Sequence, residues 1–257
     1  MGIGRISMIQ YDFPNRETLS PLSLSYSGAL TIVLCIYKLL YMTNSLKIKL
    51  YLYGVIILSF IMFYLGASRG SLVAILLSIP LLIYYKSTTN KIKVLILFIV
   101  AIPFVIYGAK ITGSAIFARS ENTIQTGDAS GRQQLYVAAF SEFLSNPIIG
   151  GRIEVSRIYP HNVFLEILMA TGLLGFVLFV SIFIKSIQRG ITMSKKDDSY
   201  LVPVLILTTG VSEGMFSGAI YGAILLFTSM GMIFSTYNSF RSKKSKVELV
   251  NTFRDDY

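Results

Sequence analysis

The sequence predicts an all-α, polytopic integral membrane protein that crosses the bilayer about seven times. Three observations predict this class. The 257 residues are 53% hydrophobic and only 14% charged, whereas a soluble domain is usually about a quarter charged. The apolar residues gather in long blocks, and the mean hydropathy is +0.64. Lysines lie in short segments between these blocks, as is typical of cytoplasmic loops.

The charge and the cysteine count exclude several other classes. A net charge of +10 would suggest a nucleic-acid partner for a soluble protein. Here the loop lysines account for it, so no nucleic-acid partner is expected. The single cysteine, Cys35, lies in an apolar block and has no partner for an intramolecular disulfide. No cluster of metal ligands is recognisable in the sequence, so neither a metal nor another cofactor is expected.

The chain divides into five regions. Residues 1–23 are polar, lack the pattern of a signal peptide, and form an external N-terminal segment. Residues 24–107 hold four predicted spans, residues 108–160 form a large external loop, residues 161–237 hold three spans, and residues 238–257 form a cytoplasmic tail. The predicted spans cover residues 24–42, 50–65, 71–85, 94–107, 162–184, 200–211 and 215–237.

Three breaks separate or bend these spans. A tight turn at residues 66–70 joins the second span to the third, and Pro80 is expected to kink the third. Residues 212–214, Ser-Glu-Gly, are expected to divide the last apolar stretch into two helices.

Basic residues predict the orientation. Clusters of lysine and arginine occupy residues 43–49, 86–93 and 185–199 and the tail after Phe240, which places these segments in the cytoplasm. With seven spans all four clusters lie on one side. The N-terminal segment then lies outside without a signal peptide, which is explained if further spans once preceded Met1 and the chain is a truncated or split product.

The external loop is predicted to contain an amphipathic helix. Asp128 to Ser130 offer an N-cap, Ser130 with Gln133 fits a capping box, and Leu135 begins an apolar face at helical spacing. Asn146 and Pro147 end the helix. Arg132 therefore lies in its first turn, where a cation beside free N–H groups favours an anion site. A solvated helix arginine is an equally good interpretation of the sequence alone.

Three further arginines are predicted to lie on the same side. Arg69 lies in the turn between the second and third spans, flanked by small residues that allow a close approach. An arginine that extends to the membrane interface is the simpler interpretation. Arg152 and Arg157 lie just before the fifth span and suit an anionic head group at the interface.

His161 is the only histidine, and Asn162 after it is the expected N-cap of the fifth span. A lone histidine is more often structural than catalytic. Its neighbours favour a functional role, because Glu166 lies about one turn further on, where a carboxylate is costly in lipid. Glu166 is expected to face the protein interior or a wet cavity, and to orient or tune His161.

These motifs resemble the C-terminal half of the O-antigen ligase and polymerase family. The resemblance rests on Ser-Arg-Gly at residues 68–70, on Gly-Arg at 131–132, on NPIIGG at 146–151, and on HNVFLEILMATGLLG at 161–175. It covers about residues 24–237. The sequence departs from the family at Tyr136, where the family often has tryptophan. Members have more spans than this chain.

The resemblance implies an activity. The family consists of multi-pass enzymes of the bacterial cytoplasmic membrane that transfer lipid-linked glycans at its outer face. The implied donor is an undecaprenyl-pyrophosphate-linked glycan and the acceptor a glycan or lipid, and other polysaccharide-assembly proteins are possible partners. By motif, Arg69 and Arg132 would neutralise the pyrophosphate and His161 would act on the acceptor hydroxyl. The expected reaction is an inverting, metal-independent glycosyl transfer.

Two alternatives stay open from the sequence. One is a transporter or flippase for lipid-linked glycans, which would need ionisable residues deep in several spans. The other is a truncated, non-catalytic membrane subunit. The motifs also do not distinguish a polymerase from a ligase.

Overall fold

The computed structural model describes residues 20–66, 68–84, 132–155 and 158–255, with side chains described up to residue 241. These parts of the chain are helical and contain no strand, which confirms the all-α class for them. The helices are α2 (Pro21–Tyr41), α3 (Leu46–Gly66), α4 (Arg69–Tyr84), α7 (Arg132–Ser145), α8 (Val163–Ser194), α9 (Leu201–Phe216) and α10 (Ile224–Asp255), with the 3-10 turns η1 (Asp198–Tyr200) and η2 (Ile220–Gly222) on either side of α9.

Four helical segments in the described chain are long and apolar enough to cross a membrane. They are α2, α3, α8, and η1 together with α9, while α4 is apolar but shorter. These segments confirm the coarse class of a helical membrane protein. The predicted span at residues 94–107 lies outside the described residues, so the number of seven spans stays a prediction.

The turn between α3 and α4 lies where the sequence predicts it. Arg69 is the first residue of α4, and the helix continues past Pro80 to Tyr84. The same turn therefore positions Arg69 at the end of the bundle where α3 finishes.

The last apolar stretch forms two helices, as predicted, but the predicted position of the break, residues 212–214, is wrong. α9 continues through these residues to Phe216, and the chain turns at residues 217–223 instead. The N–H groups of Ser217 and Gly218 both donate to the Glu213 carbonyl, at 2.9 and 2.8 Å, which closes the last turn of the helix. Within this continuous helix, the Ser212 hydroxyl donates to the Gly70 carbonyl of α4 at 2.6 Å.

The fifth predicted span, residues 162–184, differs from α8 in length and in shape. Asn162 is its N-cap as predicted, because its side chain accepts from the Leu165 N–H at 3.1 Å. The helix runs on to Ser194 and is broken at Gly172, where φ is 61° and ψ is −164°. Residues 173–194, at the usual rise per residue, are roughly 33 Å long, about the thickness of the hydrocarbon core.

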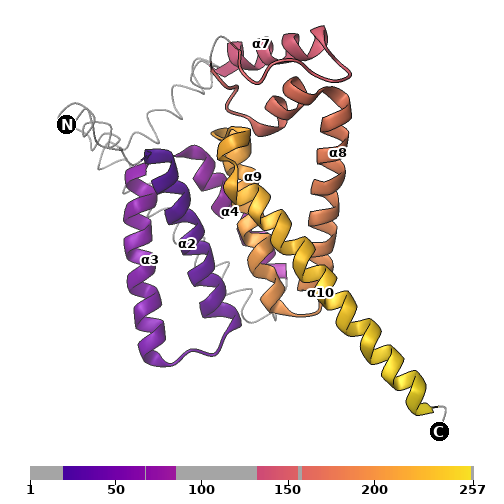
Figure 1. Cartoon of the computed structure of the whole chain (residues 1–257). Helices are drawn as coiled ribbons and strands as arrows, with labels where there is room; N and C mark the ends of the chain where they lie inside the picture. The colour runs from indigo at the N-terminus through magenta and orange to yellow at the C-terminus, as the bar shows by residue number, and fades with distance from the viewer. Residues whose placement is uncertain (1–19, 67, 85–131, 156–157, 256–257) are drawn as a thin grey trace.

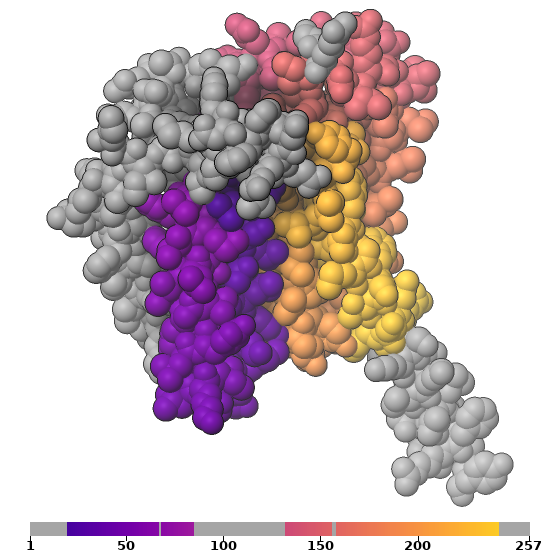
Figure 2. Space-filling model, turned by 60° about the vertical axis from the view of Figure 1, so that its left-hand side comes forward, coloured from indigo at the N-terminus to yellow at the C-terminus, as the bar shows by residue number. Residues whose placement is uncertain are grey.

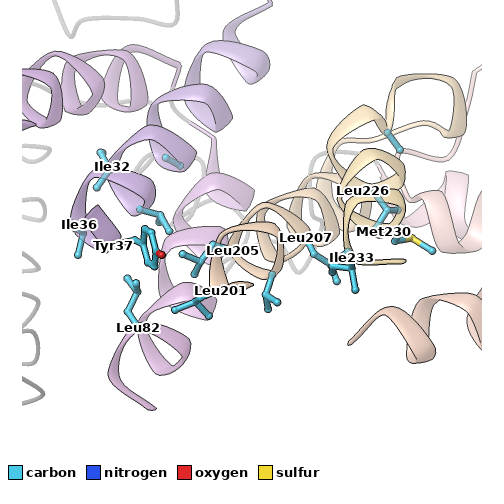
Figure 3. Close-up of a cluster of buried hydrophobic side chains, with 14 of the residues drawn as sticks. Ile32, Ile36, Tyr37, Leu82, Leu201, Leu205, Leu207, Leu226, Met230 and Ile233 are labelled. Atoms are coloured by element: carbon cyan, nitrogen blue, oxygen red, sulfur yellow. The ribbon is translucent and has the colours of Figure 1, made fainter. Parts of the chain in front are cut away.

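α9 lies at the centre of the apolar core (Figure 3). Leu201 and Leu205 face α2 and α4, where Tyr37 and Leu82 are buried. On its other side, α9 packs against α10, with Leu207 directed toward the α10 side chains that share the core. Because α9 contacts α2, α4, α8 and α10, its C-terminal end is positioned by most of the bundle.

The two ends of the bundle differ in chemistry (Figures 1 and 2). α7 lies across one end, above the first part of α8. The α2–α3 and α8–α9 connections lie at the opposite end. There the Arg189 guanidinium lies 4.3 Å from the Phe234 ring centroid, and the Lys196 ammonium lies 4.5 Å from the Phe240 ring centroid. Arg189 of α8 and Lys196 of the α8–α9 connection thus make cation–π contacts with α10.

Candidate active site

The segment at residues 212–220, which ends α9 and begins the following turn, is the meeting point of the predicted site residues. The Arg132 guanidinium donates from Nη1 to the Phe216 carbonyl. The His161 ring lies against the backbone of Ser217. The Glu166 carboxylate accepts from the Ile220 N–H at 2.9 Å. Three side chains from α7, from α8 and from the residue before its cap therefore converge on one short stretch of backbone.

The Arg132 guanidinium supplies a hydrogen-bond donor to the C-terminal end of α9. Phe216 is the last residue of α9, and the last carbonyls of a helix have no partner within it and carry the negative end of the dipole. A guanidinium is therefore well placed there. The contact uses one N–H of a group that has five, so the side chain keeps donors for an anionic oxygen. The predicted capping box at Ser130 lies outside the described residues.

Arg69 lies next to the same helix end because of how its turn is packed. A Cβ on Gly70 would lie 2.8 Å from the Phe216 Cβ and 1.8 Å from the Tyr26 hydroxyl oxygen, so only glycine fits against α9 here. Arg69 itself is half-buried and has an interaction partner in the structure.

Buried hydroxyl groups hold the turn that carries Arg69. The Ser71 hydroxyl donates to the Ser68 carbonyl at 2.7 Å, and the Ser68 N–H donates to the Ser25 hydroxyl at 3.3 Å. The Ser25 and Ser71 hydroxyl oxygens are 2.7 Å apart. Fully buried hydrogen bonds of this kind are costly to break, so the backbone before Arg69 has a defined position.

His161 has an unusual backbone and an unsatisfied ring nitrogen. Its φ of 55° lies in the left-handed region, which is uncommon for a residue with a Cβ. Its Nδ1 is buried with no hydrogen-bond partner among the described residues. Burial and the positive charge of Arg132 lower the pKa of His161, and the neighbouring Ser217 backbone opposes these two effects. The imidazole is therefore favoured in its neutral form near pH 7.

Glu166 is fully buried, as expected, but its partner differs from the one that we predicted. No hydrogen bond joins it to His161 in the described part of the chain. Its Oε2 accepts from the Ile220 N–H, at the start of η2, and its Oε1 is buried without a partner. The first N–H groups of a helical turn need an acceptor, and Glu166 supplies one. It thereby holds the turn that follows α9.

Two tyrosines that were not predicted as site residues also belong to this cluster. The Tyr159 ring centroid lies 4.4 Å from that of His161 and 5.8 Å from that of Tyr221. Burial raises the pKa of Tyr159, and its hydroxyl pairs with Tyr221, which is 79% exposed. The position of Tyr159 two residues before the only histidine was the available signal in the sequence.

The NPIIGG motif and the TGLLG motif form one interlocked unit. At the Gly172 break, Leu173 and Leu174 donate their N–H groups to the carbonyls of Pro147 and Ile148, at 2.9 and 3.1 Å. A Cβ on Gly172 would lie 2.5 Å from backbone atoms of Ile148 and Gly150. The break in α8 is thus filled by the loop that follows α7, which holds the two helices together.

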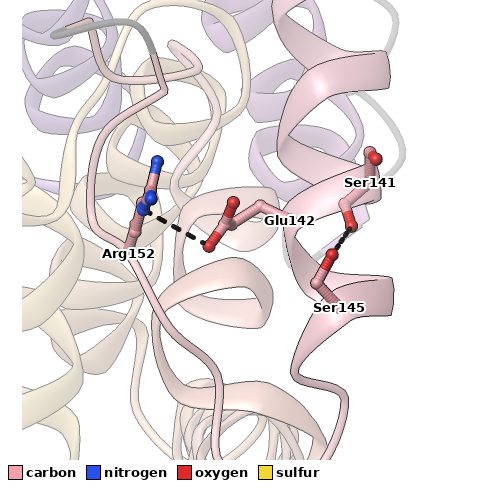
Figure 4. A network of polar contacts seen from close by, with 4 residues as sticks. All are labelled: Ser141, Glu142, Ser145 and Arg152. Carbon is pink, nitrogen blue, oxygen red and sulfur yellow. Dashed lines mark hydrogen bonds and ion pairs between the residues drawn. The ribbon is translucent and has the colours of Figure 1, made fainter.

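The other two predicted arginines are not brought to this cluster by any described contact. Arg152 is 77% exposed and forms an ion pair with Glu142 of α7, with 3.7 Å between Nε and Oε1 (Figure 4). Such exposed pairs contribute at most about 1 kcal/mol to stability. Arg157 lies outside the described residues.

One cavity among the described residues lies far from this cluster. It has a volume of about 480 Å³ and lies at the end opposite α7, between the end of α2 and the α8–α9 connection. Lys195, Lys196, Asp197 and Asp198 line it. The balance of charges argues against a strong preference for an anion. Within the described residues, no group of three histidine, cysteine, aspartate or glutamate side chains is placed to hold a metal.

The fold and the cluster together define a class of protein. The chain is an all-α membrane protein with cationic and histidine side chains gathered at one end of its bundle. Residues 54–180, just under half of the chain, match the model of the O-antigen ligase family, which confirms the family that the motifs resemble. The matched region contains all six predicted site residues but not residues 212–221. No curated protein matches the chain.

Proposed function

We propose that this protein transfers a glycan from an undecaprenyl-pyrophosphate-linked donor to a sugar or lipid acceptor, at the outer face of the bacterial cytoplasmic membrane. The family match supports the reaction class, since it implies a transferase of lipid-linked glycans. One observation carries the proposal further. Arg132 and His161 come from separate motifs, yet both meet the end of α9, where the charge of Arg132 acts on the imidazole.

In the proposed step, an acceptor hydroxyl oxygen attacks the anomeric carbon of the donor's first sugar. The bond from that carbon to the pyrophosphate oxygen breaks, and undecaprenyl pyrophosphate leaves with the electron pair. His161 takes the proton of the hydroxyl group. A single displacement of this kind inverts the anomeric centre. A neutral imidazole of lowered pKa is ready to accept a proton at pH 7.

Arg69 and Arg132 would neutralise the charge that develops on the leaving group. Guanidinium groups suit this task because they donate paired hydrogen bonds to phosphate oxygens. Both lie at the end of α9. The packed turn at Gly70 places Arg69 there, and a hydrogen bond to the Phe216 carbonyl places Arg132 there. With two guanidinium groups at the leaving group, no metal ion is required in this scheme. Transfer should therefore survive EDTA.

Glu166 has a positioning role in this scheme and not a proton-transfer role. By holding the Ile220 N–H, it fixes the turn that carries Ser217, against which His161 lies. Arg152 and Arg157 remain proposed contacts for more distant parts of the anionic donor, with Arg152 exposed enough to reach it.

The test uses cells that lack the gene and carry variants of it. Arg69→Lys and Arg132→Lys keep the charge but lose the paired geometry, so glycan transfer should fall strongly at normal protein levels. Arg241→Lys, at an exposed arginine of α10 outside the site, is the matched control and should transfer at close to the wild-type level. Full transfer in both Arg69→Lys and Arg132→Lys would contradict the pyrophosphate assignment. In the gene deletion, loss of long chains alone indicates a polymerase, and loss of all attached glycan indicates a ligase.

A further inference from the structure

α7 carries a stripe of exposed apolar side chains along one face. Val137, Phe140 and Leu144 are between 48% and 66% exposed. Their spacing of three and four residues places them on one side of the helix. Exposed apolar side chains that occur singly need no explanation, but a continuous row of large ones marks an interaction surface.

The adjoining face of α7 packs against the bundle. Ala139 and Phe143 are buried, and α7 packs against α8. The charged side chains of α7 are also engaged, since Arg132 donates to the Phe216 carbonyl and Glu142 pairs with Arg152. The contacts on this face determine which way the stripe points. Among the described residues, it lies to the side of the face that packs on α8 and is exposed.

The stripe continues onto the loop after α7. Ile148 and Ile149 are 68% and 73% exposed. The Ile148 carbonyl accepts from the Leu174 N–H at 3.1 Å, so this loop is anchored at the point where the long part of α8 begins. Residues 173 and 174 of α8 are themselves leucines and are exposed.

The exposed surface of α8 below that point belongs to a membrane-spanning helix. Leu173, Leu174, Val177 and Leu178 are between 50% and 61% exposed, on a segment long enough to cross the bilayer. In Figure 2 the surface of α7 and of the loop after it adjoins that of α8 along the upper right-hand edge of the molecule. A surface that is continuous with a lipid-facing helix and equally apolar has lipid as its natural neighbour.

We propose that α7 is an interfacial membrane helix whose stripe, Val137, Phe140 and Leu144 together with Ile148 and Ile149, lies in the acyl region of the adjacent leaflet. Figure 1 shows α7 lying across the end of the bundle, as a helix in the plane of the interface does. Such helices insert their apolar face roughly 5–10 Å below the head groups. The insertion would hold Arg132, at the start of α7, near the depth of lipid phosphate groups.

The test uses the absence of tryptophan from the chain. Single variants Val137→Trp, Phe140→Trp and Leu144→Trp each introduce the only tryptophan of the protein. Ser141→Trp and Ser145→Trp are the matched controls, on the exposed polar flank of the same helix. Leu178→Trp is the lipid reference and Ser199→Trp the water reference, because both positions are exposed on the bundle. The full-length variants are reconstituted in vesicles of phosphatidylethanolamine and phosphatidylglycerol.

Fluorescence quenching then reports what surrounds each indole ring. The stripe variants should be quenched by lipids brominated on the acyl chain, as Leu178→Trp is, and should be quenched by aqueous iodide several-fold less than Ser145→Trp. Iodide quenching of the stripe variants equal to that of Ser199→Trp would overturn the proposal, because the stripe would then face water. Protection from both quenchers would also overturn it, because another protein surface would then cover the stripe.

Discussion

At the residue scale, His161 combines two features that the surrounding structure must hold in place. A left-handed backbone at a residue with a Cβ costs on the order of 1–3 kcal/mol, and its buried Nδ1 lacks a partner among the described residues. Pro160 before it is buried, and Asn162 after it caps α8. Strain and unsatisfied polar atoms that persist between such fixed neighbours are typical of functional positions.

Substitution of His161 separates its chemical role from a structural one. His161→Ala should lower transfer by about 10²–10⁴-fold, the usual contribution of acid–base catalysis. His161→Gln can keep a hydrogen bond but cannot take up a proton, so it should be nearly as poor. Binding of the lipid-pyrophosphate donor should persist in both variants. Wild-type transfer by His161→Gln would show that His161 positions groups and is not a base, and lost donor binding would place it with the arginines.

The pKa of His161 can be measured directly, because it is the only histidine in the chain. NMR of histidine-labelled protein should give a pKa below the ordinary value of about 6.5, since burial and Arg132 both disfavour the imidazolium. Transfer should accordingly fall only when the pH drops through this lowered pKa. Arg132→Gln removes the positive charge and should raise the pKa, whereas Arg132→Lys should leave it unchanged. A pKa that is identical in Arg132→Gln and wild type would rule out the coupling.

At the scale of elements, the interlocked unit at Gly172 connects the external helix to the membrane-spanning part of α8. The break in α8 would leave the N–H groups of Leu173 and Leu174 without partners. The loop after α7 supplies the carbonyls that accept from them. The position of α7, and with it that of Arg132, therefore depends on two short motifs rather than on the apolar packing alone.

Gly172→Ala should destabilise the protein. A residue with a Cβ at these backbone angles costs on the order of 1–3 kcal/mol, and here the Cβ would also lie 2.5 Å from backbone atoms. Gly231→Ala is the control, because nothing lies within 4 Å of its Cβ position in α10 and alanine favours helix by up to about 1 kcal/mol. Heating in detergent followed by size-exclusion chromatography measures both. Equal survival of Gly172→Ala and wild type would contradict the interlock.

Local patterns in the sequence were sufficient for some elements and not for others. The apolar blocks around α2 and α3 and the Asn162 cap were predicted, because their signals lie within a few residues. The end of α9 was misplaced, because Gly214 and Gly218 carry the same local signal for the end of a helix. The break at Gly172 depends on residues 147 and 148, which no local pattern of α8 reveals.

In the candidate site, too, some features could be predicted from local patterns and others could not. Its arginines and its histidine could be selected singly from their motifs, while the segment at residues 216–220 that joins them lies outside the motifs and outside the family match. The partner of Glu166 is a backbone N–H from another element. A pairing of this kind depends on the turn after α9, whose position the sequence pattern did not predict.

At the scale of the whole molecule, the asymmetry between the two ends of the bundle predicts its orientation in the membrane. α7 and the cluster at the end of α9 lie at one end, and the basic connection after α8 lies at the other. Positively charged connections stay in the cytoplasm, so α7 should face outward. The lipid-linked glycan and the acceptor would then be reached from outside the cell, where the proposed chemistry takes place.

A pair of matched cysteine variants tests this orientation. In a Cys35→Ala background, which removes the only native thiol, Ser145→Cys marks the end of α7 and Ser199→Cys marks the α8–α9 connection. Both serines are exposed and the substitution is nearly isosteric. A membrane-impermeant maleimide added to intact cells or spheroplasts should label Ser145→Cys and not Ser199→Cys, and lysis should make Ser199→Cys reactive. Labelling of both positions in intact cells, or of Ser199→Cys alone, would contradict the predicted topology. In that topology the two ends of the bundle lie on opposite sides of the membrane. The positive connections then remain inside, while Arg132 and His161 face the donor.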